Sequence, residues 1–145
     1  MRFMMLMIPR VYQAGEAAKG PPPMPDAEGI AAMMKFNKEL QDAGALIALD
    51  GLHPPAAGGR VEYRGGKAFV SDMPLPEAKE VIGGYWIIRT ASVEEAMDWA
   101  RRCPAFDGDV IEVRRIQEME DFSEESIGPS RELAQSISEK LTSGS

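Results

Sequence analysis

The sequence predicts an α+β domain whose elements follow the order strand, helix, strand, hairpin, strand, helix, strand. Three observations support this prediction. Residues 2–8 form an apolar run without a polar side, helix-start signals stand at Asp26 and Ser92, and Gly65-Gly66 separates two short strand-like runs. Without the hairpin, this order is the βαββαβ pattern of a ferredoxin-like domain. The 145 residues are enough for one such domain and an appendage.

The first half of the chain supplies a strand, a loop, a helix and a second strand. Residues 2–8 read RFMMLMI, and a strand that is apolar on both sides belongs in the middle of a sheet covered on both faces. Residues 10–25 contain PPPMP and predict a long loop, or alternatively a lid over a pocket. Asp26 is the expected N-cap of a helix that ends at Gly44 and carries Met33, Phe36, Leu40 and Ala43 at helical spacing. Residues 45–49 continue as a strand, and Asp50-Gly51 is expected to turn the chain.

The second half supplies the hairpin, a strand, a helix and the last strand. Residues 60–64 and 67–71 form the arms of the hairpin, and residues 85–90 form the next strand. Ser92 and Glu95 make a capping box for a helix with one apolar face, consisting of Val93, Ala96, Met97, Ala100 and Cys103; Pro104 ends it. Residues 109–116 alternate, with Ile111 and Val113 inward and Glu112 and Arg114 outward.

The last 28 residues form an appendage. We expect the domain to occupy residues 1–117 and an acidic linker and C-terminal helix to occupy residues 118–145. A helix over residues 129–141 would carry Leu133, Ile137 and Leu141 on one side. Three apolar residues cannot stabilise an isolated helix, so it must dock on its own domain or on a second subunit.

Composition excludes several classes of protein. Sixteen basic against twenty-three acidic residues give a net charge of −7, which disfavours binding to nucleic acid or to an anionic membrane. One cysteine and one histidine exclude a disulfide, a cysteine metal cluster and a multi-histidine site, so we expect no metal and no cofactor. The apolar start ends at Pro9-Arg10, too early for a signal peptide, and no later run approaches membrane-spanning length, which predicts a cytoplasmic protein.

Charge and backbone constraint concentrate in residues 71–86, SDMPLPEAKEVIGGYW. Asp72 either closes an Asx-type turn or acts as a ligand contact or catalytic group. Glu77 and Lys79, with Glu80, form either a solvated charge cluster or part of a pocket. In a pocket, Lys79 would hold an anionic group while Glu77 or Asp72 served as general base.

Four further residues are candidates for chemistry or binding. His53 is the only side chain whose ordinary pKa lies near neutrality, and it is either an acid–base group or a polar turn residue. Tyr85 and Trp86 must point to opposite faces of their strand, so that one packs under the helices and the other can orient a ligand. Arg10 is either an anion contact or a surface residue. Cys103 is expected to be buried and inert.

Scattered motifs resemble the YCII-related proteins, in particular the branch marked by an Asp-Gly-Pro-Phe (DGPF) motif. The matching residues span positions 1–122 and comprise MRFMMLMI, Phe36-Asn37, Glu39-Leu40, Gly51-Leu52, Pro54-Pro55, the GGK hairpin, Asp72, Pro74, Glu77, Lys79-Glu80, Gly83-Gly84-Tyr85 and Ile111-Glu112-Val113-Arg114. The resemblance implies a ferredoxin-like fold that dimerises by packing two sheets face to face, the dimeric α/β barrel. Such packing would cover the second face of residues 2–8.

The sequence departs from this family at two places. The signature itself reads Asp72-Met73-Pro74-Leu75, which lacks both the glycine and the phenylalanine. Some YCII-related proteins carry a histidine in the first helix and an aspartate before the proline that follows the second helix. Here the first helix has no histidine and Cys103 precedes Pro104, so no activity based on that pair carries over.

Three classes of function remain open. The first is a homodimeric small-molecule-binding or regulatory domain, which the missing pair and the ten methionines favour. The second is a cofactor-free lyase or isomerase acting on a small polar or anionic substrate, with His53 or Asp72 moving a proton and Lys79 and Tyr85 stabilising negative charge. The third is a protein-interaction module, which the C-terminal segment favours.

Overall fold

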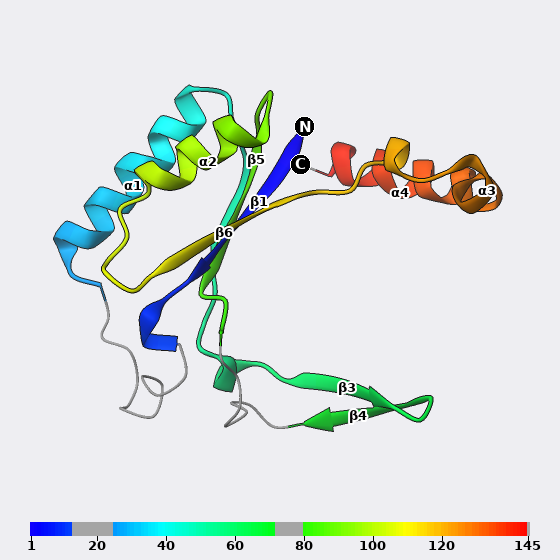
Figure 1. Ribbon diagram of the computed structural model, residues 1–145, viewed down its shortest axis with the longest axis horizontal. Coiled ribbons are helices and arrows are strands. Elements are labelled where there is room, and N and C mark those ends of the chain that lie inside the picture. Colours follow the sequence, from blue (N-terminus) through cyan, green and yellow to red (C-terminus); the bar gives the residue numbers. More distant parts are fainter. Residues whose placement is uncertain (13–24, 72–79, 145) are drawn as a thin grey trace. The chain divides into compact units, whose positions relative to one another are not determined.

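The computed structural model describes residues 1–12, 25–71 and 80–144. The chain forms two compact units, Met1–Arg115 and Ile116–Ser145. The first unit has α+β architecture, as the sequence predicts. Its strands are β1 (Arg2–Ile8), β2 (Leu46–Gly51), β3 (Arg60–Arg64), β4 (Lys67–Ser71), β5 (Gly84–Arg89) and β6 (Val110–Arg115), and its α-helices are α1 (Ala27–Asp42) and α2 (Val93–Arg102) (Figure 1).

Four strands form one antiparallel sheet in the order β2-β5-β1-β6. β1 lies between two neighbours, which confirms the central position predicted from its apolar sequence. Its buried residues Phe3 and Met5 alternate with the half-buried Met4 and Leu6. This strand order and the two intervening helices are compatible with a ferredoxin-like fold.

The helices begin and end where the sequence predicts because side chains satisfy their terminal backbone groups. The Asp26 carboxylate accepts a hydrogen bond from the Gly29 N–H at 2.8 Å, and Gly44 adopts a positive φ of 72° just after α1. At α2, the Ser92 hydroxyl accepts from the Glu95 N–H at 3.2 Å, while the Glu95 carboxylate accepts from the Ala91 N–H.

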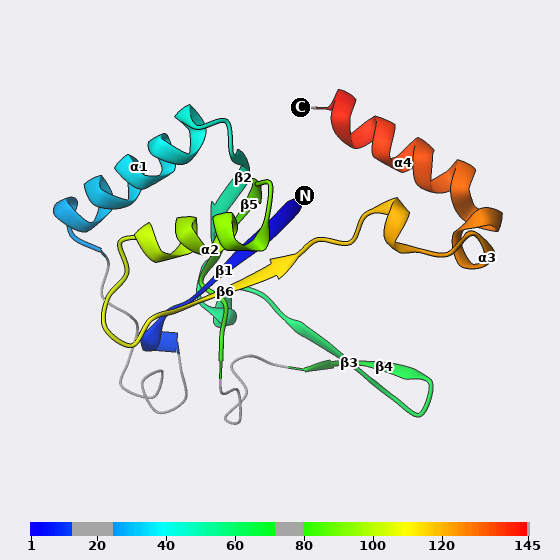
Figure 2. The ribbon, with the colours of Figure 1, turned by 45° about the horizontal axis from the view of Figure 1, so that its top comes forward.

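Both helices cover the same face of the sheet and enclose the core (Figure 2). Phe36 of α1 packs edge-on against Trp86 of β5 and Trp99 of α2, with ring centroids 5.9 and 6.3 Å apart. The indole N–H of Trp86 donates to the Asn37 Oδ1 at 2.8 Å, which satisfies a polar group inside the core.

The apolar face predicted for α2 is wrong in part. Ala96 and Cys103 are buried and Ala100 packs against the core, but Val93 and Met97 are 46% and 40% exposed. Trp99 is buried in their place, with the Arg102 guanidinium 3.7 Å above its ring. The buried stripe is therefore rotated toward Trp99, whose large ring removes more apolar surface from water than Val93 or Met97 would.

The predicted hairpin is confirmed, and one predicted turn is wrong. Gly65 and Gly66 have positive φ values of 57° and 76°, and they join β3 to β4 in a separate two-stranded sheet. By contrast, Asp50 and Gly51 do not turn the chain. They continue β2 and pair with Tyr85 and Gly84 of β5, so the chain leaves the strand only at Leu52.

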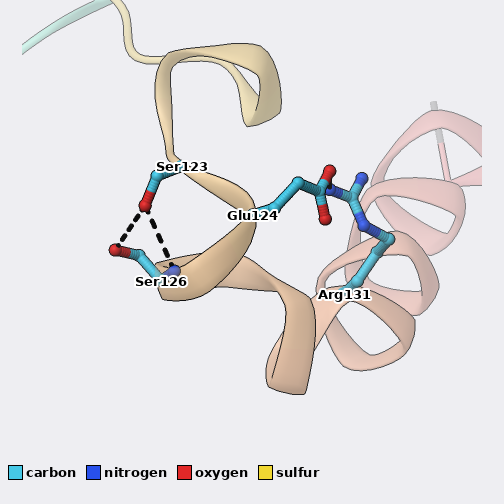
Figure 3. A network of polar contacts seen from close by, with 4 residues as sticks. All are labelled: Ser123, Glu124, Ser126 and Arg131. Atoms are coloured by element: carbon cyan, nitrogen blue, oxygen red, sulfur yellow. Dashed lines mark hydrogen bonds and ion pairs between the residues drawn. The ribbon is translucent and has the colours of Figure 1, made fainter.

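The second unit carries the predicted C-terminal helix, α4 (Arg131–Ser143), preceded by η4 (Met119–Asp121), α3 (Glu124–Ile127) and η5 (Gly128–Ser130). The expected acidic linker thus contains short helical turns. Ser123 caps α3 by accepting from the Ser126 N–H at 3.2 Å, and the Arg131 guanidinium pairs with the Glu124 carboxylate (Figure 3). The apolar side of α4 is exposed at Leu133, Ile137 and Leu141.

Candidate functional site

An open cavity of about 540 Å³ lies beside the end of β2 and the start of β5. Its described lining comes from two segments, the connection from β2 to β3 and the three residues that precede the Gly83-Gly84 pair. The lining residues are 52–55, 57–60 and 80–82. Cavities of this size accommodate small organic molecules.

Gly83 fastens both segments of the cavity wall to the central sheet. Its carbonyl accepts from the Leu52 N–H at 2.9 Å, and its own N–H donates to the Met7 carbonyl at 2.8 Å. A Cβ at this position would lie 2.5 Å from Cγ of Pro9 and 3.2 Å from Cε2 of Tyr12. Only glycine allows the strand this close to residues 9–12.

The described part of the cavity wall combines an apolar surface with three groups that can carry charge. Pro54 and Pro55 introduce the 3₁₀ turn η3 (Pro55–Ala57), which sets one wall. His53, Arg60 and Glu80 contribute an imidazole, a guanidinium and a carboxylate to the lining. The structure thus brings the predicted His53 together with Glu80, which the sequence assigned to a charge cluster or a pocket, and with Arg60, which the sequence did not single out.

His53 is exposed on the cavity wall. Within the described part of the chain, no hydrogen bond to its imidazole is found. The orienting partners expected for it, Asp72 and Glu77, lie outside the described residues, as does Lys79. Among the described lining residues, the carboxylate that accompanies His53 is that of Glu80.

Tyr85 lies on the sheet face opposite the helices, while Trp86 is buried beneath them. The Tyr85 hydroxyl donates to Oδ2 of Asp50, its cross-strand neighbour, at 2.8 Å. This hydrogen bond, together with the negative charge of Asp50, raises the pKa of the Tyr85 phenol, because ionisation would remove the donor and place two anions side by side. Tyr85 is not among the described residues that line the cavity.

Arg10 helps to hold the turn between α2 and β6. Its backbone N–H donates to Oδ1 of Asp109 at 2.9 Å, and Oδ2 of the same carboxylate accepts from the Phe106 N–H. The Arg10 side chain lies against Gly108, where an added Cβ would come within 2.5 Å of its Cδ. Gly108 has a φ of 92°, so glycine is favoured there on two grounds.

Cys103 closes the C-terminal end of α2 and is 9% exposed. Burial, reinforced by the negative charge of Asp109, raises the pKa of its thiol to about 11. A thiol in this environment is a poor nucleophile near neutral pH.

No group of three or more His, Cys, Asp or Glu side chains in ranges 1–12, 25–71 and 80–144 is arranged to hold a metal ion. Across the same ranges, no helix is both long and apolar enough to cross a bilayer.

The fold and this cavity define an α+β domain with one helix-covered sheet face and a ligand-sized hollow beside the sheet. The chain belongs to the YCII-related domain family, whose model matches residues 1–120. An uncharacterized protein of Rhizobium meliloti (strain 1021) is 37% identical over 64 residues, which are 44% of this chain. The matched region spans 52% of that relative's length.

Proposed function

We propose that this chain is a homodimeric domain that binds a small organic molecule in the cavity beside β2 and β5, in a binding or regulatory role. The observation that carries the proposal is the composition of the cavity, whose wall is largely aliphatic and proline surface with only His53, Arg60 and Glu80 as polar side chains among its described residues. Apolar lining with a few polar groups is typical of binding sites for small molecules.

The dimer is supported by the sheet face that carries Tyr85. Because directly paired residues point to the same side, strand pairing places apolar Met4, Leu6, Ala48 and Ile87 in the middle of this face. No α-helix in the described part of the first unit covers them (Figure 1). A second copy laid face to face would cover this apolar surface, and stable interfaces bury about 800 Å² on each partner.

Charge on the same face favours one orientation of the two copies. The row through Leu6 and Tyr85 ends in carboxylates, Asp50 on β2 and Glu112 on β6. Arg114 stands in the next row, and Arg89 in the row beyond it. We therefore place the two-fold axis between the two sheets, parallel to them and perpendicular to their strands. In this arrangement the acidic row of each copy lies over the basic rows of the other, and β6 faces the partner's β6.

Charge reversal on β6 tests the dimer. Glu112→Arg alone and Arg114→Glu alone place like charges in contact across the interface and should shift the protein toward monomers in sedimentation velocity. The double variant restores opposite charges and should recover the dimer, while Arg101→Glu on the outer side of α2 should change nothing. A monomeric wild-type protein, or a double variant no better than the single ones, contradicts the proposed packing.

Ligand binding is tested by a fragment screen on isotope-labelled protein comprising residues 1–145. Binding fragments should perturb amide resonances of residues 52, 53, 56–60 and 80–82. A screen in which no fragment perturbs these resonances contradicts a binding function for the cavity.

An enzymatic role is the second candidate, because His53 and the carboxylate of Glu80 line one cavity. The reaction would be of the lyase or isomerase kind, with His53, or Asp72, moving a proton. His53→Asn would then bind fragments from the screen normally but lose turnover of any compound that the wild-type protein converts. Equal turnover by wild type and variant contradicts a catalytic His53.

A protein-interaction role is the third candidate, and the exposed Leu133, Ile137 and Leu141 of α4 favour it. We take residues 118–145 as a separate C-terminal segment. Its removal should reduce the number of chains in the assembly in solution if α4 contributes to association, whereas an unchanged number of chains contradicts this role.

We also place the chain in the DGPF-type branch of the family. Its altered signature, residues 72–75, lies outside the described part of the chain. Support comes from matching residues that meet in space, since Gly51 of β2 pairs with Gly84 of β5. An alignment of many relatives that groups this chain with another branch would contradict the placement.

A further inference from the structure

The cavity has one permanently cationic side chain in its described lining, Arg60. Arg60 is the first residue of β3, and its side chain is 45% exposed. Among the described residues, its ionic partner is Glu62, with 4.0 Å between Nε and Oε1, the outer limit of an ion pair. Within the described part of the chain, no hydrogen bond to the guanidinium group is found, so its donors are open to a ligand.

Apart from His53 and Glu80, the rest of the described wall is apolar and can contact the hydrocarbon part of a ligand. Leu52, Pro54 and Pro55 lie on the segment that leaves β2, and Val81 and Ile82 lie on the segment that enters β5. Leu52 and Ile82 are 44% and 42% exposed, which is apolar surface that a ligand could remove from water. Gly58 and Gly59 add no side chains between this surface and Arg60.

We propose that the ligand is a small organic monocarboxylate, with its carboxylate on Arg60 and its apolar body against Leu52, the two prolines and Ile82. This inference rests on the proposed binding function and names its ligand class. A guanidinium matches the two oxygens of a carboxylate in a bidentate pair. Glu80 places a negative charge in the same lining, which disfavours a dianion such as phosphate.

The test compares three probes on the protein of residues 1–145 by amide chemical-shift titration. Phenylacetate carries the carboxylate and an apolar ring, phenylacetamide has the same shape without the charge, and inorganic phosphate has charge without the ring. Phenylacetate should perturb residues 52–60 and 80–82 and bind about tenfold more tightly than phenylacetamide, the factor expected for one charge-assisted hydrogen-bond pair. Titration with inorganic phosphate should produce no saturable chemical-shift change at these residues.

Two arginine variants on the same strand identify the contact. Arg60→Gln removes the charge and should weaken phenylacetate binding about tenfold while leaving phenylacetamide binding unchanged. Arg64→Gln is the matched control, because Arg64 ends the same strand but does not line the cavity, and it should bind both probes as the wild type does. An unperturbed amide spectrum elsewhere in each variant shows that the fold is retained.

Several outcomes overturn the inference. If phenylacetamide binds the cavity as tightly as phenylacetate, or Arg60→Gln binds phenylacetate normally, the ligand class is wrong while the binding function stands. Phosphate binding at Arg60 with equal affinity also refutes a monocarboxylate site. If neither aromatic probe shifts the amide resonances of the cavity residues, this inference fails. The broader fragment screen then tests separately whether the cavity binds any small molecule.

Discussion

Replacing Gly83 with alanine tests whether the cavity wall is fastened to the sheet by close backbone packing. The added Cβ would lie 2.5 Å from Cγ and 2.9 Å from Cδ of Pro9, against 3.4 Å at the near edge of ordinary contact. The deficit is about 0.9 Å, and it falls on a proline ring that cannot rotate away. Either β1 and residues 9–12 must move, or the hydrogen bonds of Gly83 to Met7 and Leu52 must lengthen.

The expected cost follows from overpacking alone, because Gly83 is not among the described glycines with positive φ. Extra methyl groups in well-packed sites destabilise by about 1–3 kcal/mol. Gly51→Ala is the matched control, since Gly51 stands at the end of β2 with no atom within 4 Å of its would-be Cβ. Its free energy of unfolding should stay within about 0.5 kcal/mol of the wild-type value.

Urea unfolding followed by tryptophan fluorescence measures both variants, since Trp86 and Trp99 lie in the core. Amide spectra provide a second readout, because Gly83→Ala should shift the resonances of residues 7, 52 and 82 while Gly51→Ala disturbs only its own neighbours. Equal stability of the two variants would refute the reasoning, as would a destabilised Gly83→Ala protein whose Leu52 and Met7 resonances do not move.

Three further predictions concern single contacts. Asn37→Ala removes the acceptor of the Trp86 indole N–H and should lower the free energy of unfolding by about 1–3 kcal/mol. The control Lys38→Ala, on the exposed side of α1, should change the free energy of unfolding by less than about 0.5 kcal/mol. Equal effects of the two variants in urea unfolding would contradict this role of Asn37. Cys103, buried and with a pKa of about 11, should react with iodoacetamide near neutral pH only after unfolding, and rapid labelling of the native protein would show that the thiol is accessible. Asp50→Asn should lower the pKa of Tyr85 toward its ordinary value of 10.0 in a titration of phenolate absorbance, with Tyr63→Phe simplifying the signal. The pKa of Tyr85 is higher in the folded than in the unfolded protein, so the stability contributed by its hydrogen bond to Asp50 is present below pH 10.0 and is lost as the pH rises through the folded pKa. An Asp50→Asn protein in which Tyr85 titrates as it does in the wild type would contradict this.

Local signals predict most of the elements because each acts through neighbouring backbone groups. Asp26 and Ser92 cap helices by accepting hydrogen bonds from residues three positions later, and Gly65-Gly66 supplies the two positive φ values of a tight hairpin. Such contacts depend on a few adjacent residues, so they can be inferred without knowledge of the tertiary structure.

The errors arise where distant packing decides the outcome. On α2, apolar spacing alone cannot distinguish a stripe through Val93 and Met97 from one through Trp99; contact with Phe36 of α1 selects the second. Asp50-Gly51 has the composition of a turn, yet pairing with β5 extends β2 through both residues. The cavity could not be predicted from local sequence patterns either, because Arg60 and Glu80 are twenty positions apart in the chain. Their segments line one cavity in the folded protein, where Gly83 hydrogen-bonds to both Leu52 and Met7 of β1.

The sheet face opposite α1 and α2 shows what register adds to a sequence pattern. Alternation along β6 predicts that Glu112 and Arg114 point outward, and the structure confirms it. Alternation cannot predict that Glu112 shares a row with Asp50, because the two residues belong to opposite edge strands and are linked only through Tyr85 and Leu6. Register therefore gives this face an acidic row beside a basic one. Opposite charges would meet in a face-to-face dimer only if the acidic row of each copy lay over the basic row of the other. If the dimer forms as proposed, the same register that ties Tyr85 to Asp50 also sets how the two copies meet.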